Sequence, residues 1–154
     1  MVQVQGLIKS FGTFYALRGI DLELPRGLFL SIFGPNGAGK STFIRILSTL
    51  SRPSSGKILI DGKPLLENAE EIRQRLGVIA HATYLYDELT AMENLQFYAR
   101  LYNLPNPTDR IHQALSEVGL EARKHDLVRT FSRGMQQRLS IARAMLHEPD
   151  ILLL

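Results

Sequence analysis

The glycine-rich sequence GPNGAGKS, from Gly34 to Ser41, constrains the fold of this chain more than any other feature. It matches the pattern G-x-x-x-x-G-K-[ST]. The residues before it, Leu28 to Phe33, are almost all apolar, which predicts a strand buried on both faces. The residues after it, 42–50, carry apolar side chains at helical spacing. A buried strand, a glycine-rich loop and an amphipathic helix in this order predict an α/β fold.

The chemistry of this loop favours a bound triphosphate. Glycines allow backbone angles that other residues avoid, so successive N–H groups can turn towards one anion. The N-terminal dipole of the following helix favours the same negative charge. The ammonium of Lys40 can reach the β- and γ-phosphates, and the hydroxyl of Ser41 can bind Mg²⁺, which prefers oxygen ligands. The predicted nucleotide-binding residues are Gly34, Pro35, Asn36, Gly37, Ala38, Gly39, Lys40, Ser41 and Thr42.

The rest of the chain alternates short apolar runs with amphipathic segments. Val2, Val4 and Ile8 are expected on one face of the first strand. Further signals are local: Asp61-Gly62 predicts a turn, Thr90 and Glu93 match a capping box, and Ser132 can cap a helix that reaches about His147. Strands are also expected at residues 20–24, 57–60, 76–80 and 150–154, and helices at 42–50, 68–75, 90–102 and 111–118. The pattern predicts a largely parallel central sheet interrupted by a helical insertion.

Composition excludes several classes of protein. The 154 residues include no cysteine, which excludes a disulfide scaffold, a cysteine-bound Fe–S cluster and a cysteine nucleophile. No apolar run approaches the ~18–20 residues of a transmembrane helix, and the N-terminus does not resemble a signal peptide, so a cytoplasmic protein is expected. The net charge is +3, and residues 121–143 hold six basic and two acidic side chains. This local excess is more simply explained by an anionic nucleotide than by a nucleic acid.

A second motif, Phe131 to Arg138 (FSRGMQQR), precedes an amphipathic helix. Alone, it is typical of a helix cap followed by a solvated face. Its Ser132 lies 92 residues after Lys40, and the apolar run Ile151 to Leu154 follows it. A phosphate loop, a signature L-S-G-G-Q about 90 residues later and an apolar Walker B strand are the ordered motifs of one family. The chain therefore resembles the nucleotide-binding subunit of an ABC transporter over its whole length.

This resemblance implies a P-loop NTPase (RecA-like) core with N-terminal antiparallel strands and an inserted helical subdomain. The core would span about 1–84 and 135–154, and the helical subdomain about 85–134. A second copy of the chain, or a paralogous subunit, would form a head-to-tail dimer that sandwiches ATP and Mg²⁺. Phe11 would stack on adenine; the alternative is ordinary core packing. In trans, the partner's ATP would meet Ser132, Arg133, Gly134, Met135 and Gln136.

Three departures from the family pattern have consequences. Arg133 and Met135 replace signature residues, and Arg133 is equally consistent with a role near a trans γ-phosphate and with a side chain that points to water. His81 stands where the family has the Q-loop glutamine. It could have a catalytic role by holding a water molecule near Mg²⁺; the alternative is a histidine at the end of a strand with no catalytic role. Finally, the chain stops before the Walker B aspartate and glutamate, so the C-terminal part is expected to be missing and these 154 residues to be inactive and poorly soluble alone.

Membrane permease subunits are the expected partners, with contact near Tyr84, Leu85 and Tyr86; core packing of these residues is the alternative. The subunit would then lie peripherally on the inner face of the cell membrane, and no nucleic acid is expected. His81, the second motif and residues 88–102 also resemble haem exporters of cytochrome c maturation. Two other functions stay open: a non-hydrolysing ATP-binding partner and a soluble ABC ATPase that acts on ribosomes.

Overall fold

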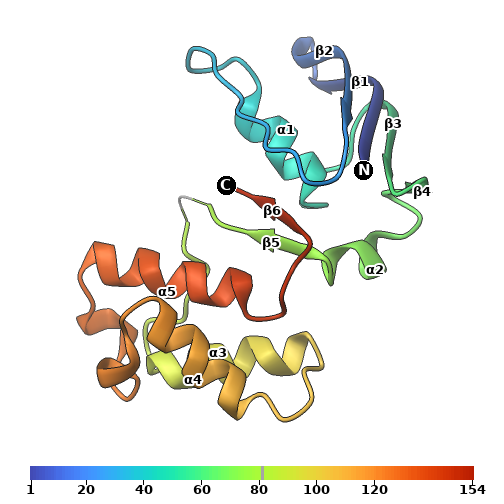
Figure 1. Ribbon diagram of the computed structural model, residues 1–154. Coiled ribbons are helices and arrows are strands. Elements are labelled where there is room, and N and C mark those ends of the chain that lie inside the picture. Colours follow the sequence, from blue (N-terminus) through green and yellow to red (C-terminus); the bar gives the residue numbers. More distant parts are fainter. Residues whose placement is uncertain (81) are drawn as a thin grey trace. The chain divides into compact units, whose positions relative to one another are not determined.

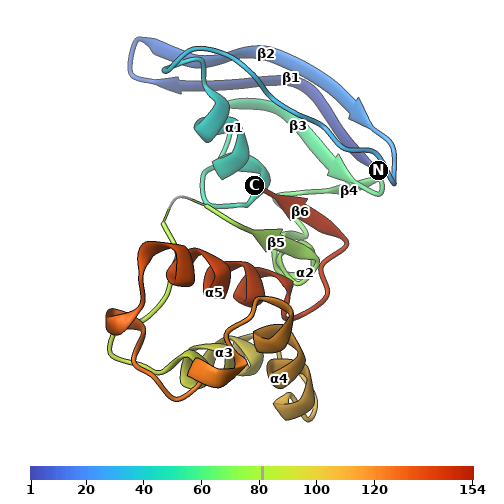
Figure 2. The same cartoon turned by 60° about the vertical axis from the view of Figure 1, so that its left-hand side comes forward.

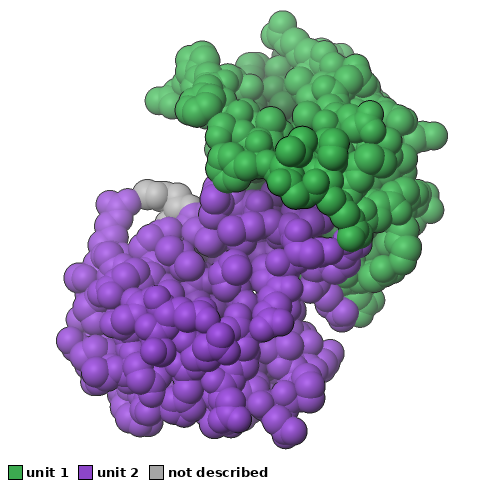
Figure 3. Space-filling view, in the orientation of Figure 1, with its two compact units in different colours: residues 1–73 green, residues 74–154 purple. Residues whose placement is uncertain are grey.

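The computed structural model describes residues 1–80 and 82–154. The chain divides into two compact units, Met1–Arg73 and Gln74–Leu154 (Figure 3). None of the helices in these residues is long and apolar enough to cross a membrane.

The first unit is built on a four-stranded antiparallel sheet in the order β2-β1-β3-β4 (Figures 1 and 2). Its strands are β1 (Val2–Phe11), β2 (Phe14–Leu24), β3 (Ser55–Ile60) and β4 (Lys63–Pro64). Helix α1 (Lys40–Leu47) lies along one face of this sheet, and α2 (Ala69–Arg73) follows β4. Because Phe43, Ile46 and Leu47 recur at helical spacing, one side of α1 is buried, as the sequence predicts.

A β-bulge in β1 changes which residues enter the core. Val4 pairs with Leu22 and Leu7 with Ile20, so β1 has one more residue than β2 over this interval. Gly6 lies in this bulge with φ 55°. The extra residue shifts the alternation, so Leu7 is fully buried beside Val4 and Ile8 is only half-buried. The expectation that Ile8 shares the buried face is therefore wrong.

The expected buried strand over Leu28–Phe33 is not formed. Residues 25–39 contain no strand, and the side chains of Phe29 and Phe33 are 81% and 89% exposed. A strand needs neighbours for its N–H and C=O groups. Neither sheet in the described part of the chain pairs with this segment, so its apolar sequence has no ladder to join.

The second unit holds the parallel part of the fold. Strands β5 (Leu76–Val78) and β6 (Ile151–Leu153) pair in parallel, with Leu76 opposite Ile151. Helix α5 (Arg133–Met145) lies between this two-stranded sheet and the helices α3 (Ala91–Leu101) and α4 (Thr108–Glu117) (Figures 1 and 2). Two 3₁₀ turns, η1 (Glu121–Arg123) and η2 (Val128–Thr130), connect α4 to α5. The parallel pairing and the inserted helices agree with the predicted α/β class, although the larger sheet is antiparallel.

The local signals in the sequence are confirmed. Thr90 and Glu93 form both bonds of the capping box at the start of α3, and Ser132 caps α5. Gly119, with φ 68°, follows the C-terminus of α4. Asp61 and Gly62 both have positive φ and form the turn between β3 and β4.

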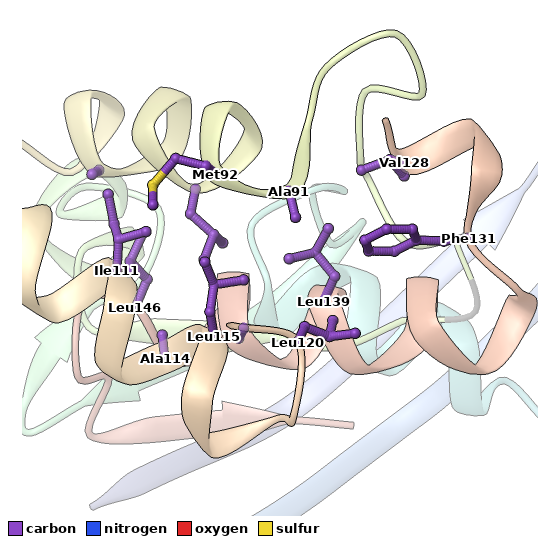
Figure 4. Close-up of a cluster of buried hydrophobic side chains, with 13 residues drawn as sticks. Ala91, Met92, Ile111, Ala114, Leu115, Leu120, Val128, Phe131, Leu139 and Leu146 are labelled. Atoms are coloured by element: carbon purple, nitrogen blue, oxygen red, sulfur yellow. The ribbon is translucent and has the colours of Figure 1, made fainter. Parts of the chain in front are cut away.

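The core of the second unit is one apolar cluster between the three helices (Figure 4). Leu95 and Ala99 of α3, Leu115 of α4 and Leu139 of α5 are fully buried in it. Tyr98 packs against the cluster, whereas Leu101 at the end of α3 is 60% exposed. The thirteen buried members are Ala91, Met92, Leu95, Ala99, Ile111, Ala114, Leu115, Leu120, Val128, Phe131, Leu139, Ala142 and Leu146.

Candidate nucleotide-binding site

The glycine-rich loop ends at Gly39, which occupies the N-cap position of α1. Its backbone lies in the left-handed region, with φ 88° and ψ 0°. A Cβ atom at this position would lie 2.4 Å from the carbonyl oxygen of Ala16 and 2.9 Å from Leu17 Cδ2. Both the torsion angle and the close approach of β2 therefore require glycine here.

The N-terminus of α1 has no side-chain cap among residues 1–80 and 82–154. Its first turn holds no acidic residue. The first N–H groups of a helix have no acceptor within that helix, and they carry the positive end of its dipole. An anion at this position would therefore receive backbone hydrogen bonds and a favourable field.

Lys40 folds back over the loop that precedes it. Its Nζ donates hydrogen bonds to the carbonyl oxygens of Gly34 and Pro35, at 2.7 and 2.8 Å. Residues 34–38 are exposed, and the N–H of Ala38 donates to Pro35 O at 3.2 Å. An exposed loop with an ammonium group beside an open helix start fits a phosphate chain.

A magnesium ion would rely on oxygen from Ser41 rather than on a cluster of acidic residues. The described residues contain no group of three or more His, Cys, Asp or Glu that could hold a metal ion. Ser41 is exposed in the first turn of α1, next to Lys40. A hydroxyl beside a phosphate site suits Mg²⁺, which commonly takes further ligands from the phosphates and water.

Phe11 lies at the end of β1, where the chain turns into β2. Its side chain is 56% exposed, so it is not a core residue, and Lys9 Nζ lies 4.9 Å from the centre of its ring. Phe14 and Tyr15 on the same hairpin are 58% and 51% exposed. Sequence reasoning missed these two, although the cluster of aromatic residues around Gly12 could have indicated an exposed aromatic tip.

The five residues of the second motif divide into two groups. Ser132, Arg133 and Gly134 are exposed, and Ser132 Oγ accepts a hydrogen bond from Met135 N at 3.3 Å. Met135 packs against the core of the second unit, and Gln136 Nε2 donates to Val128 O at 3.3 Å. The first group presents polar atoms at the start of α5, whereas the side chains of the second group hold the helix in place.

Most of the basic excess between residues 121 and 143 is used within the second unit. Arg133 has no ion pair or hydrogen bond to other residues in the part of the chain that the structure describes. The other five have acidic or carbonyl partners: Arg123 with Asp126, Lys124 with Glu121, Arg129 with Glu88, Arg138 with Val118 O, and Arg143 with Val78 O. Arg133 is thus the basic side chain of this stretch that is left to solvent.

The residues expected to contact a permease differ in exposure. Tyr84 and Tyr86 are each 48% exposed, whereas Leu85 packs against the apolar cluster. The ring of Tyr86 meets Phe97 edge-on at 4.9 Å. His81, which the sequence places in catalysis and near Mg²⁺, lies outside the described residues.

An exposed glycine-rich loop at an uncapped helix start is the arrangement typical of the P-loop class. Residues 17–154 match the family model described as ABC transporter, so the chain belongs to the ABC transporter family and carries its ATP-binding domain. It is 40% identical over 141 residues to the ABC transporter ATP-binding protein NatA of Bacillus subtilis (strain 168), covering 90% of this chain and 57% of NatA.

Two further similarities support the same assignment. The linearmycin resistance ATP-binding protein LnrL of the same organism is 35% identical over 156 residues, covering 100% of this chain and 50% of LnrL. The solved post-hydrolysis dimer of the ATP-binding cassette MJ0796, bound to ADP and Pi, is 30% identical with a TM-score of 0.87, covering 99% of this chain and 72% of that one. The chain therefore has the α/β fold of ABC ATPase domains and spans about half the length of the curated relatives it matches.

Proposed function

We propose that this chain is part of the ATP-binding subunit of an ABC transporter, which couples ATP binding and hydrolysis to movement of a substrate across a membrane. The open start of α1, with Gly39 fixed by its close approach to Ala16 O and Lys40 folded over the loop, carries this proposal. In it, residues 34–42 hold the phosphates, Ser41 supplies a hydroxyl to Mg²⁺ and Phe11 offers its exposed ring to adenine.

The second motif would complete a site on another subunit. In a head-to-tail dimer of two copies, or of this chain with a paralogous subunit, residues 132–136 would face the partner's γ-phosphate. The exposure of Ser132, Arg133 and Gly134 supports such a role. Arg133 would bring positive charge because it has no acceptor in the described part of its own chain, whereas a glycine at this position would bring none. The solved MJ0796 cassette is a dimer, which agrees with this arrangement.

His81 is proposed to hold the attacking water near Mg²⁺, in the place of a glutamine. A neutral imidazole can accept a hydrogen bond from water at one nitrogen and donate from the other. We expect His81→Ala in the full-length protein to lower the ATPase rate and weaken its coupling to transport. An unchanged rate and unchanged coupling would show that His81 has no part in turnover.

The permease contact is proposed near Tyr84 and Tyr86, at the start of a helical subdomain that spans about 85–134. The core would be formed by about 1–84 and 135–154. Tyr84 and Tyr86 are half-exposed, and Tyr86 packs against Phe97, so these side chains offer an amphipathic surface to a membrane subunit. The subunit would lie on the inner face of the cell membrane.

For the transported substrate, we propose only a chemical class. LnrL is a linearmycin resistance protein, and a relative in Bacillus licheniformis is the bacitracin transport ATP-binding protein BcrA. These names favour export of a small molecule such as an antibiotic. Haem export, the narrower resemblance in the sequence, has no counterpart among the relatives named here.

Nucleotide binding and turnover of the full-length protein test the proposal together. We expect Mg²⁺-dependent binding of a fluorescent ATP analogue that Lys40→Ala weakens about 100-fold. We also expect ATP hydrolysis when the protein is purified with its membrane partners. Binding without hydrolysis would favour the non-hydrolysing alternative, for which the substituted signature residues Arg133 and Met135 argue. Cosedimentation with ribosomes in place of membranes would favour the soluble alternative.

A further inference from the structure

Arg143 is a cation in the interior of the second unit. It lies on α5 and is only 7% exposed, although Leu139, Ala142 and Leu146 around it on the helix are apolar and buried. Its Nη2 donates a 2.6 Å hydrogen bond to the carbonyl oxygen of Val78, the last residue of β5. The helix that begins at the second motif is thereby joined to the end of a strand of the parallel sheet.

Two aromatic rings enclose the same guanidinium. Its central carbon lies 5.6 Å from the ring centre of Tyr84 and 5.3 Å from that of Tyr98. The hydroxyl of Tyr98 in turn donates a hydrogen bond to the carbonyl oxygen of Tyr84. Burial raises the pKa of Tyr98, while the nearby charge of Arg143 acts in the opposite direction, so the phenol keeps its proton and remains a donor.

Stability alone does not explain an arginine at this position. Its Nε–H is buried and has no acceptor within residues 1–80 and 82–154. A buried charge with an unsatisfied donor is unfavourable, and a well-packed apolar side chain of similar volume is often as stable or more so. The arrangement does, however, use features that only arginine combines: a planar face for two rings and a directed donor for a carbonyl.

We infer that Arg143 is a positioning residue for ATP turnover, which ties Val78 and Tyr84 to α5. These two residues stand on either side of His81 in the sequence, at distances of three residues each. Arg143 thus contacts one residue before and one residue after His81 from the helix that starts at Ser132. The kinetic part of this inference rests on the proposed function, because it assumes that His81 and the second motif act in hydrolysis.

Hydrogen exchange of the full-length protein tests the contact without any need for ATPase activity. Arg143→Met removes both the positive charge and the planar guanidinium group, whereas Arg143→Lys keeps the charge and one possible hydrogen bond to Val78 O. We expect amides in residues 79–86 to exchange about tenfold faster in Arg143→Met, with a smaller increase in Arg143→Lys and no change in α4. Arg138→Met is the matched control, because Arg138 is on the same helix but exposed.

Steady-state kinetics supply the second readout. We expect Arg143→Met to lower kcat about tenfold and to leave the KM for ATP within about twofold, since the phosphate loop lies in the other unit. If this variant does not fold, Tyr98→Phe keeps the cation and the ring and removes the hydrogen bond to Tyr84 O. We then expect faster exchange confined to the peptides that contain Tyr84.

Distinct results would overturn the inference. Unchanged exchange in residues 79–86, or equal acceleration across α3, α4 and α5, would show that Arg143 only fills the core. An unchanged kcat in a protein that hydrolyses ATP would show that Arg143 does not position residues for turnover. A wild-type protein that binds but never hydrolyses ATP would contradict the proposed function instead. In that case the exchange data alone would decide whether Arg143 holds Val78 and Tyr84.

Discussion

The starts of α1 and α3 solve the same problem in opposite ways. Each helix leaves its first N–H groups without partners inside the helix. At α3 the chain supplies the acceptors: Thr90 Oγ1 accepts from Glu93 N at 3.2 Å, and Glu93 Oε2 accepts from Thr90 N at 2.8 Å. At α1 the N-cap residue is Gly39, no side chain caps the helix, and no acidic residue lies in its first turn.

A helix start can therefore serve either stability or binding. A capping box satisfies donors permanently and makes a helix independent of any ligand. An uncapped start loses that stabilisation but keeps its donors for an anion. The start of α5 is intermediate, because Ser132 satisfies one N–H while Arg133 and Gly134 remain exposed.

The largest effect should come from removing the charge at α1. We expect Lys40→Ala to weaken ATP binding about 100-fold, because a charge-assisted contact to the phosphates is lost. Fluorescence titration with a labelled ATP analogue measures this. Lys57 is an exposed lysine on β3, in the same unit. Lys57→Ala removes an equal charge and should leave the affinity for ATP unchanged. Equal affinities of the two variants would mean that the start of α1 is not the phosphate site.

The second effect is on stability at the same position. Gly39→Ala places a Cβ 2.4 Å from Ala16 O at φ 88°, so we expect a loss of about 2–3 kcal/mol in the free energy of unfolding. Gly19→Ala is the control, since Gly19 has φ 82° and no atom of the described residues lies within 4 Å of where its Cβ would stand. The control should lose only about 1 kcal/mol. Urea denaturation measures both, and equal losses would show that the contact with Ala16 is unimportant.

The third effect concerns the closed helix start. Thr90→Ala removes the cap of α3, and we expect the second unit to lose about 1 kcal/mol of stability without any change in ATP affinity. Thr108→Ala at the start of α4 makes the same substitution where no side-chain cap exists, and should cost less than about 0.5 kcal/mol. A change in ATP affinity in Thr90→Ala would break the distinction between the two kinds of helix start.

The smallest effect is a pH dependence of stability, caused by Glu93 in the capping box of α3; α1 has no acidic residue in its first turn. Hydrogen bonds from the backbone and then the side chain of Thr90 hold the pKa of Glu93 below its ordinary value of 4.5. The contribution to stability is therefore present above the unfolded pKa and is lost as the pH falls through the folded one. We expect the thermal unfolding midpoint, Tm, of the second unit to fall less in Glu93→Gln than in wild type when the pH is lowered from about 7 to about 3.5. Identical pH profiles would mean that the Glu93 bonds do not form in solution.

Short-range signals in the sequence predicted the fold well. The capping residues Thr90 and Ser132, the turn at Asp61 and the helix after Gly39 depend on neighbours within a few residues, and all four agree with the structure. The bulge at Gly6 was missed because it depends on how three strands pair. The segment 28–33 was mispredicted because an apolar run specifies a strand only when neighbouring strands accept it.

The candidate site shows the same division. The exposed glycine-rich loop before α1 could be predicted because its residues are contiguous in the sequence. Arg143 could not, since its partners Val78, Tyr84 and Tyr98 are distant in sequence and only the packing brings them together. A charged residue on the apolar side of α5 was the one signal available for it.

The close approach of Gly39 to Ala16 has a consequence for ligand size. β2 carries Ala16 and is joined by a two-residue turn to the strand that ends at Phe11, so one hairpin carries the aromatic tip and packs against the end of the glycine-rich loop. This packing sets the distance between the ring of Phe11 and the start of α1. A ligand that contacted both would be selected by the distance between its base and its terminal phosphate, independently of the chemical groups that side chains recognise.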